Sequence, residues 1–360
     1  MSSATAALTG AICVLAAVVA LVSLSVGSSD LSLREVLEAL VGRGDPSARL
    51  VVGTLRLPRI ATGLLVGIAF AVSGALLQTM ARNPLASPDV LGVSAGASAA
   101  AVSVLVLAGS AGGISGLAAA AGLPVAAMAG GLATTALVAV LASNGPGPIA
   151  ARRGVARIGG RVGGGGFDAG RVVLVGIGVS AAANSVVSWL LVIGDVNDAS
   201  RAAAWLAGSL NARSWTDALP VALAVVVLVP LAAGHGRALS VLVLGDDVAA
   251  SLGIRLTRTR VVLLAVAAVL AATATSAAGP VAFVALVAPQ VAQRLARTDR
   301  PPLLTAAAVG ALLVVTADLV ARTGLELAGV GPHELPVGVV TAACGAPYLI
   351  HLVGRQRKES

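Results

Sequence analysis

Long apolar stretches recur along this chain from end to end, separated by short clusters of Gly, Pro and Arg. Most of them run for about 18 to 25 residues, enough for an α-helix to cross the hydrocarbon core of a bilayer. With 57% apolar and 11% charged residues, the 360-residue chain carries more apolar surface than a water-soluble core can hide. Because lipid offers the backbone no hydrogen-bond partners, the stretches predict an all-α polytopic membrane protein.

The apolar stretches predict ten transmembrane helices within a single domain that covers residues 1–360. The boundary at Gly279-Pro280 is the least sharply defined, because apolar residues continue on both sides of it. The first stretch has no basic segment before it and no clear small-residue cleavage site, so we expect a retained helix rather than a signal peptide. The expected spans are 5–27, 57–80, 89–109, 117–142, 171–193, 218–234, 259–278, 280–297, 302–322 and 334–354.

Arginines are distributed unequally between the two sets of connections that ten spans create. With the N-terminus in the cytoplasm, the cytoplasmic connections hold about twice as many Arg and Lys residues as the opposite ones, as the positive-inside rule requires. Both termini are then cytoplasmic. This topology accounts for the net charge of +8 without nucleic-acid binding, and an aromatic content of 2% offers little surface for stacking bases.

Residues with catalytic chemistry are scarce. The only lysine is Lys358, so the sequence has no G-x-x-x-x-G-K phosphate-binding loop, and any ATP would be hydrolysed by another subunit. The glycine-rich stretch 159–166 has no strand before it and is expected to be a flexible connection. The three His are scattered, and Cys13 and Cys344 lie inside expected spans. We therefore expect a chain that is not itself an enzyme and that binds no metal and no cofactor.

Small residues recur at helical spacing in the second and third expected spans. Gly63, Gly67 and Gly74 lie in the second span, and Gly92 and Gly96 in the third. In a membrane, small residues let helix backbones approach closely, so we expect tight helix packing here rather than contact with a ligand.

Several short motifs point to one known family. They are RLPR at 56–59, SGALLQ at 73–78, RNPLA at 82–86, LGVSAGA at 91–97 and WLAGSL at 205–210. With the segments 277–295 and 334–352, these motifs make nearly the whole chain closely resemble the permease subunits of bacterial type II ABC importers for iron-siderophores, haem and vitamin B12, the FecCD/BtuC-like permeases. The resemblance implies a bundle like that of the vitamin B12 importer permease. It also implies a dimer that works with two cytoplasmic ATPase subunits and an external substrate-binding protein.

Residues 28–56 form the expected periplasmic segment before the second span. Ser32 and Glu35 have the spacing of a capping box, and the apolar residues around them predict a short helix against the membrane surface. Arg56 and Arg59 follow, on the side where few cations are expected. The resemblance implies that these arginines meet carboxylates of the binding protein, where charge pairing would set the docking orientation. Snorkelling to lipid headgroups is the alternative.

The fifth span carries a polar stripe, because Ser180, Asn184 and Ser188 are spaced four apart and share one helical face. Interhelical hydrogen bonding would explain such a stripe. The resemblance implies instead that this span borders the central translocation path, together with a short external helix at 201–210. The candidate path residues of that helix are Trp205, Gly208 and Ser209.

Two cytoplasmic features are expected at the ends of the spans. After the second span Pro84 stops the helix, and Asp89 is placed to cap the third span. The cytoplasmic turn consists of Arg82, Asn83 and Pro84. Between the sixth and seventh spans, the segment 244–258 is expected to form two short helices. The resemblance implies that this segment fits a cleft on the ATPase subunit and transmits its closure, with an inert connecting loop as the alternative. The residues assigned to coupling are Asp246, Asp247, Ser251, Leu252, Gly253 and Arg255.

Asp318 is the sole carboxylate deep in an expected span and would be costly if it were unpaired. Arg322 lies one turn further along the helix and is the expected partner in a structural ion pair. A proton relay is the alternative, although the sequence provides no second acid or histidine deep in a span to complete it. Gln290 departs from the resembling family, many members of which carry His after the proline, and either side chain can form hydrogen bonds.

Taken together, the sequence predicts a multi-pass permease subunit of the bacterial cytoplasmic membrane that imports a ferric siderophore. Haem or cobalamin is the alternative cargo. An ion-coupled secondary transporter, which would need buried ligands for the coupling ion, is an alternative of a different class, and a receptor or scaffold that transports nothing is a third. The sequence leaves open whether the dimer pairs this chain with itself or with a related permease.

Overall fold

The computed structural model describes residues 3–27, 31–110, 117–143, 169–327, 329, 331 and 334–359. The glycine-rich stretch 159–166 lies outside the described residues. Within them, every regular element is helical, and seven helices are long and apolar enough to cross a membrane. The other three predicted spans correspond to α5 and α16, whose apolar parts are shorter, and to the 13-residue α14, so ten helices match the ten predicted spans. The ten are α1 (Ser3–Ser25), α4 (Leu57–Ala81), α5 (Val93–Ser110), α6 (Leu117–Ser143), α8 (Ala169–Ile193), α10 (Trp215–Gly234), α13 (Leu256–Ala278), α14 (Val284–Ala296), α15 (Leu303–Leu327) and α16 (Val337–Glu359).

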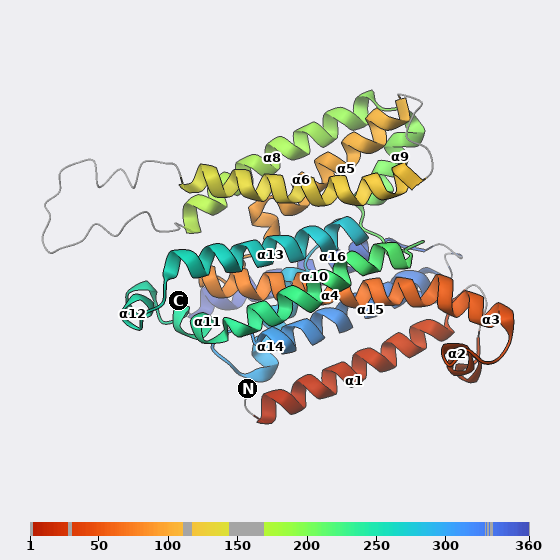
Figure 1. Ribbon diagram of the computed structural model, residues 1–360, viewed down its shortest axis with the longest axis horizontal. Coiled ribbons are helices and arrows are strands. Elements are labelled where there is room, and N and C mark those ends of the chain that lie inside the picture. The colour runs from red at the N-terminus through yellow and green to blue at the C-terminus, as the bar shows by residue number, and fades with distance from the viewer. Residues whose placement is uncertain are drawn as a thin grey trace, which may run out of the picture.

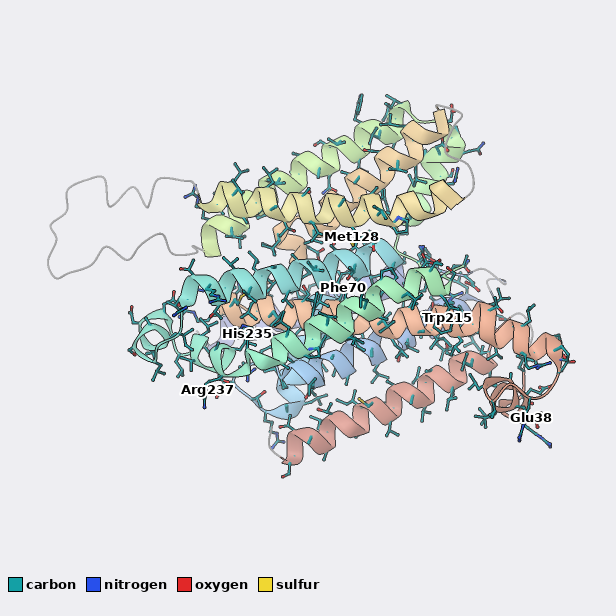
Figure 2. All side chains as sticks on the ribbon, viewed as in Figure 1. Glu38, Phe70, Met128, Trp215, His235 and Arg237 are labelled. Carbon is teal, nitrogen blue, oxygen red and sulfur yellow. The ribbon has the colours of Figure 1, made fainter. Side chains whose placement is uncertain are left out.

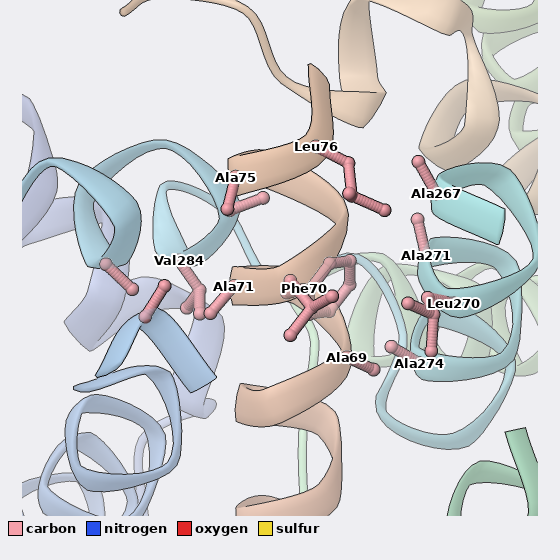
Figure 3. Packing of buried hydrophobic residues seen from close by; sticks show 14 of the residues in the cluster. Ala69, Phe70, Ala71, Ala75, Leu76, Ala267, Leu270, Ala271, Ala274 and Val284 are labelled. Atoms are coloured by element: carbon pink, nitrogen blue, oxygen red, sulfur yellow. The ribbon is translucent and has the colours of Figure 1, made fainter. Parts of the chain in front are cut away.

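The helices form two groups that lie side by side (Figure 1). One group contains α5, α6, α8 and the short helix α9 (Val196–Leu206), and the other surrounds α4. Most residues of the apolar stretches in α4, α13 and α15 are buried, whereas most of those in α1, α6, α8 and α10 are not buried in the single chain. Figure 3 shows Phe70 and Leu76 of α4 packing beside Leu270 and the alanines of α13. The core therefore lies along α4.

The two ends of the bundle carry different short elements. At one end, called here the α2 end, lie α2 (Leu33–Leu40) and α3 (Pro46–Leu50). At the other, the α12 end, lie both chain termini, α11 (Gly236–Leu242) and α12 (Asp246–Ser251). Charged side chains such as Glu38 and Arg237 mark these two ends, whereas Phe70 lies within the bundle (Figure 2).

The predicted capping box at the start of α2 is present. The Ser32 hydroxyl accepts a hydrogen bond from the Glu35 amide, and the Ser32 amide donates to the Glu35 carboxylate at 2.8 Å. Hydrogen bonds to this carboxylate, led by the one from the Ser32 hydroxyl, hold the pKa of Glu35 below its usual value. Of the apolar residues on α2, Val36 is fully buried while Leu33 and Leu37 are exposed. An exposed apolar face on a short surface helix agrees with the expected position against a membrane surface.

The second span begins earlier than the sequence predicted. From Pro46 the helical backbone continues through α3 and the π-helical segment η1 (Val51–Arg56) into α4. Only the first part of the expected periplasmic segment 28–56 is therefore separate from the span, and its residues 28–30 lie outside the described residues. The third span begins later than predicted, because a 3-10 turn, η2 (Pro88–Leu91), and Gly92 with a φ of 74° precede α5. Asp89 lies in η2, where its carboxylate accepts a hydrogen bond from the Ser94 hydroxyl at 2.5 Å.

The connection between α13 and α14 is non-helical and lies inside the bundle. Gly279 has a φ of 74°, and a Cβ there would overlap the carbonyl of Trp205. The Ser209 amide donates to the Ala278 carbonyl, immediately before the connection, at 2.8 Å. Gly208 and Gly338, which are bonded to each other at 3.1 Å, both pack against the Pro280 carbonyl. Irregular backbone at membrane depth is tolerated where protein buries it. The span predicted at 280–297 is accordingly shortened to α14.

Tight helix packing at the predicted small residues is confirmed. A Cβ on Gly67 would overlap the Gly310 carbonyl of α15, and one on Gly74 would overlap the Ala285 carbonyl of α14. In the other group, a Cβ on Gly96 of α5 would overlap Thr134 of α6. Such backbone contact supplies the van der Waals attraction that holds helices together in lipid.

We predict that Gly67→Ala and Gly10→Ala change stability in opposite directions. The methyl group at position 67 must displace the α15 backbone, which should lower stability by about 1 to 3 kcal/mol. Gly10 of α1 has no neighbouring atom within 4 Å of an added Cβ, so the helix propensity of Ala should raise stability there by up to about 1 kcal/mol. Thermal unfolding in detergent measures both, and equal shifts would contradict the proposed α4–α15 contact.

Candidate functional site

A group of charged side chains joins three helices at the α2 end. We call it the Asp318 cluster, and it consists of Arg56, Arg59, Asp318, Arg322 and Glu334. Three cations meet two carboxylates in it, beside the C-terminal end of α1, where free carbonyls carry partial negative charge.

Asp318 of α15 lies at the centre of the cluster, with its side chain only 3% exposed. Arg59 of α4 donates to both carboxylate oxygens, through Nη2 at 2.9 Å and through Nε at 3.1 and 3.2 Å. Arg322 forms a second ion pair with Asp318 at 3.3 Å, as the sequence predicted. The principal partner, Arg59, was missed because 259 residues separate it from Asp318.

Arg56 and Arg322 donate hydrogen bonds to the backbone carbonyls at the C-terminal end of α1. Arg56 donates to the carbonyls of Leu24 and Ser25 at 2.7 and 3.1 Å. Arg322 donates to the carbonyls of Ser23 and Val26 at 3.1 and 3.2 Å, and also to the Ser23 hydroxyl. Helix ends leave four carbonyls without intrahelical partners, and arginine donors satisfy them. The cluster thus fixes α1 against α4 and α15.

Arg56 and Arg59, the predicted docking residues for the binding protein, already have partners within the chain. Both residues are buried in the chain, and both guanidinium groups bond to groups of the chain itself. Arg59 has one accessible partner, since Nη1 bonds at 2.9 Å to Glu334, whose side chain is 44% exposed. Docking through these arginines stays a prediction, and an external carboxylate would reach Arg59 where Glu334 now lies.

A second charged group lies at the α12 end. The turn after α4 is formed as predicted: Arg82 ends the helix with a φ of 49°, and the Asn83 side chain accepts a hydrogen bond from the Leu85 amide at 2.9 Å. Arg82 also reaches Asp246 of α12 at 3.3 Å, and Arg260 of α13 reaches the same carboxylate oxygen at 2.7 Å. The structure therefore joins the predicted turn to the predicted coupling segment.

The coupling segment itself forms an exposed knob. Of the two short helices expected in 244–258, one is α12, and the other is simply the start of α13 at Leu256. Gly245 and Gly253, with φ values of 112° and 79°, flank α12. Asp247, Ser251, Leu252, Gly253 and Arg255 are all exposed. An exposed apolar and acidic knob of this kind suits a complementary protein surface.

The predicted path residues fall in two different environments. On α8, Asn184 and Ser188 are exposed in the single chain, while Ser180 turns towards Gly92. Trp205 is instead buried at the end of α9 among residues of α5 and α6, and Gly208, with a φ of 69°, packs on the Pro280 carbonyl. The short external helix expected at 201–210 begins and ends earlier than predicted, because α9 stops at Leu206. Its remaining candidate, Ser209, accepts a hydrogen bond from the Asn211 amide at 3.1 Å.

Sequence reasoning also missed a buried amide pair. Gln290 of α14 donates to the Gln78 side-chain oxygen at 2.7 Å, and Gln78 donates in turn to the Leu286 carbonyl at 3.0 Å. Gln78 belongs to the SGALLQ motif, whose polar residue in an apolar helix was the available signal. Across the part of the chain that the structure describes, no group of three His, Cys, Asp or Glu residues is arranged to hold a metal ion.

Comparison with known proteins places the chain among transport permeases. The sequence model of the FecCD transport family matches residues 14–152 and 155–355. The ferric enterobactin transport system permease protein FepG of Escherichia coli (strain K12) is 38% identical over 333 residues, 92% of this chain and 91% of that protein. The cobalamin import system permease protein BtuC of Halobacterium salinarum is 33% identical over 85% of this chain and 74% of its own length. A solved structure described as an inward-facing conformation of a metal-chelate type ABC transporter has a TM-score of 0.76 at 25% identity, covering 96% of this chain and 98% of that one.

We predict that Asp318→Asn destabilises the protein far more than Glu334→Gln. The first change leaves two buried guanidinium groups without their carboxylate, at a cost of about 3 to 5 kcal/mol. The second removes one ion pair to a partly exposed carboxylate and should cost about 0 to 1 kcal/mol. Urea or thermal unfolding of the purified protein measures the difference, and similar losses would show that Asp318 is not the centre of the cluster.

Proposed function

The chain belongs to the FecCD transport family of ABC permeases, and from that premise we propose that it carries a ferric siderophore across the cytoplasmic membrane. The observation that supports this cargo is full-length similarity to a ferric enterobactin permease at 38% identity. The bundle built around α4, with an exposed knob at one end, agrees with a subunit that forms a path and receives motion from a partner.

We propose that a separate ATPase subunit supplies the energy. The chain has a single lysine, Lys358, and no phosphate-binding loop, so ATP would be bound and hydrolysed elsewhere. The exposed knob around α12 offers the surface that such a subunit would engage, and we therefore assign the α12 end and both termini to the cytoplasm. Closure of the ATPase would then shift the permease between inward-open and outward-open arrangements.

A second permease, either a copy of this chain or a paralogue, is proposed to cover the exposed face of α8. The stripe that includes Asn184 and Ser188 would then border the path between the two subunits. Weakly polar side chains suit the passage of a bulky chelate, because they bind it too loosely to retain it. The same two residues would otherwise meet lipid, where unpaired polar groups are costly.

An external substrate-binding protein is proposed to dock at the α2 end. Charge reversal at Arg56 and Arg59 should weaken its association, because opposite charges guide such encounters. Since this change also disrupts the Asp318 cluster, Asp318→Asn is the matched control. Co-purification of the two proteins measures association. A larger loss for the arginine variants supports docking through them, and an equal loss assigns the effect to the cluster.

Cobalamin is the second candidate cargo, because a cobalamin permease is 33% identical over most of this chain. Haem remains a third candidate from the family resemblance. An ion-coupled mechanism is less well supported, since the one carboxylate deep in a span, Asp318, is already bonded to two arginines.

We expect a strain that lacks this chain to lose uptake of iron-labelled siderophore and to regain it when the chain is restored. Haem and cobalamin uptake, measured in parallel, should not change. Expression with an ATPase partner that cannot hydrolyse ATP should abolish the restored uptake. Uptake that persists with that partner would indicate a secondary transporter, and loss of haem or cobalamin uptake instead would reassign the cargo.

A further inference from the structure

The knob at the α12 end has few rigid attachments to the bundle. Helix α12 is only six residues long, and a glycine with a positive φ lies on each side of it. Glycine at such positions permits backbone rotation that other residues resist. Ala249 is the one buried residue of α12 and packs into the main core, while Val248 and Leu252 are exposed. With this one small apolar contact, much of any motion of α12 would be taken up by rotation at the flanking glycines unless a further side-chain bond transmits it.

Asp246, the first residue of α12, provides that connection. Its Oδ1 atom accepts from Arg82 at 3.3 Å and from Arg260 at 2.7 Å. The Arg260 side chain is 9% exposed, so this ion pair is partly shielded from water, whereas Arg82 and Asp246 are 45% and 40% exposed. Shielding strengthens the pair with Arg260 relative to a surface ion pair.

The two arginines belong to the most buried helices of the molecule. Arg82 ends α4 and Arg260 lies in the second turn of α13, and most residues of the apolar stretches in these helices are buried. The two helices also pack against each other along the core, as Figure 3 shows for Phe70 and Leu270. One carboxylate on the knob is thus bonded to the ends of two helices that form the centre of the bundle.

We propose that Asp246 is a positioning residue that transmits displacement of α12 to α4 and α13. This inference rests on the proposed function, in which an ATPase subunit pushes on the knob. A carboxylate shared by two cations holds α12 at a fixed place relative to both helices, so α12 cannot shift without moving them or breaking a bond. Asp299, in the connection after α14 at the same end, is exposed and forms no ion pair among the described residues, so it offers no such connection.

The test compares Asp246→Asn with Asp299→Asn in the complete transporter, assembled with its ATPase and binding protein in proteoliposomes. Each variant removes one negative charge from the same end of the bundle. Asp246→Asn should lower the amount of siderophore transported per ATP hydrolysed by about 2-fold to 30-fold, the range for residues that couple distant sites. Asp299→Asn should stay within about 2-fold of the unchanged protein, and Asp246→Glu, which keeps the carboxylate, should restore most of the coupling.

Further measurements separate a coupling defect from other losses. Co-purification with the ATPase shows whether each variant assembles, and if Asp246→Asn does not, Arg82→Gln tests the same bond from the other side. In a double-mutant cycle, the effects of Arg82→Gln and Asp246→Asn should be less than additive. Equal transport per ATP in the two Asn variants would overturn the inference, whereas absence of ATP-dependent transport by the unchanged protein would overturn the proposed function instead.

Discussion

Close backbone contact along α4 is the constraint on which the rest of the structure depends. Lipid is as apolar as the helices it surrounds, so helix association relies on van der Waals contact and on buried polar bonds. Gly67 and Gly74 bring α15 and α14 against the α4 backbone, where any larger residue would collide. Those contacts set the positions of the charged groups at both ends, because α4 is followed directly by Arg82 and carries Arg59 in its first turn.

The ion pairs at the two ends of α4 differ in how far they are exposed to solvent. Arg59 is bonded to a carboxylate that is almost fully buried, within a cluster that also closes the end of α1. Arg82 is bonded to a carboxylate on an exposed helix flanked by two glycines. Removing one partner of a buried pair is costly, whereas an exposed pair contributes little stability. The first group is therefore suited to holding the helices in place, whereas the second links a short exposed helix to them.

Local signals in the sequence were sufficient for the helices and several of their ends. Apolar length predicted the spans, Ser32 and Glu35 predicted the start of α2, and the spacing of Asp318 and Arg322 predicted their ion pair. Contacts between distant segments were beyond such signals: nothing near Arg59 indicates Asp318, and nothing near Asp246 indicates Arg82. Gly279-Pro280 indicated a boundary before α14, but not that residues 279–283, which are largely apolar, form a non-helical segment against which Gly208 and Gly338 pack.

The hydrogen bonds at the C-terminal end of α1 come partly from a residue that is synthesised much later. Arg322, which bonds to the carbonyls at the end of α1, follows Ser23 by 299 residues. During synthesis α1 reaches the membrane long before the ribosome adds α15, so its last turn remains incompletely bonded while most of the chain is inserted. Helix α1 therefore gains its bonds from Arg56 early and those from Arg322 only after α15 has been made, so insertion of α1 and completion of its contacts are separate steps.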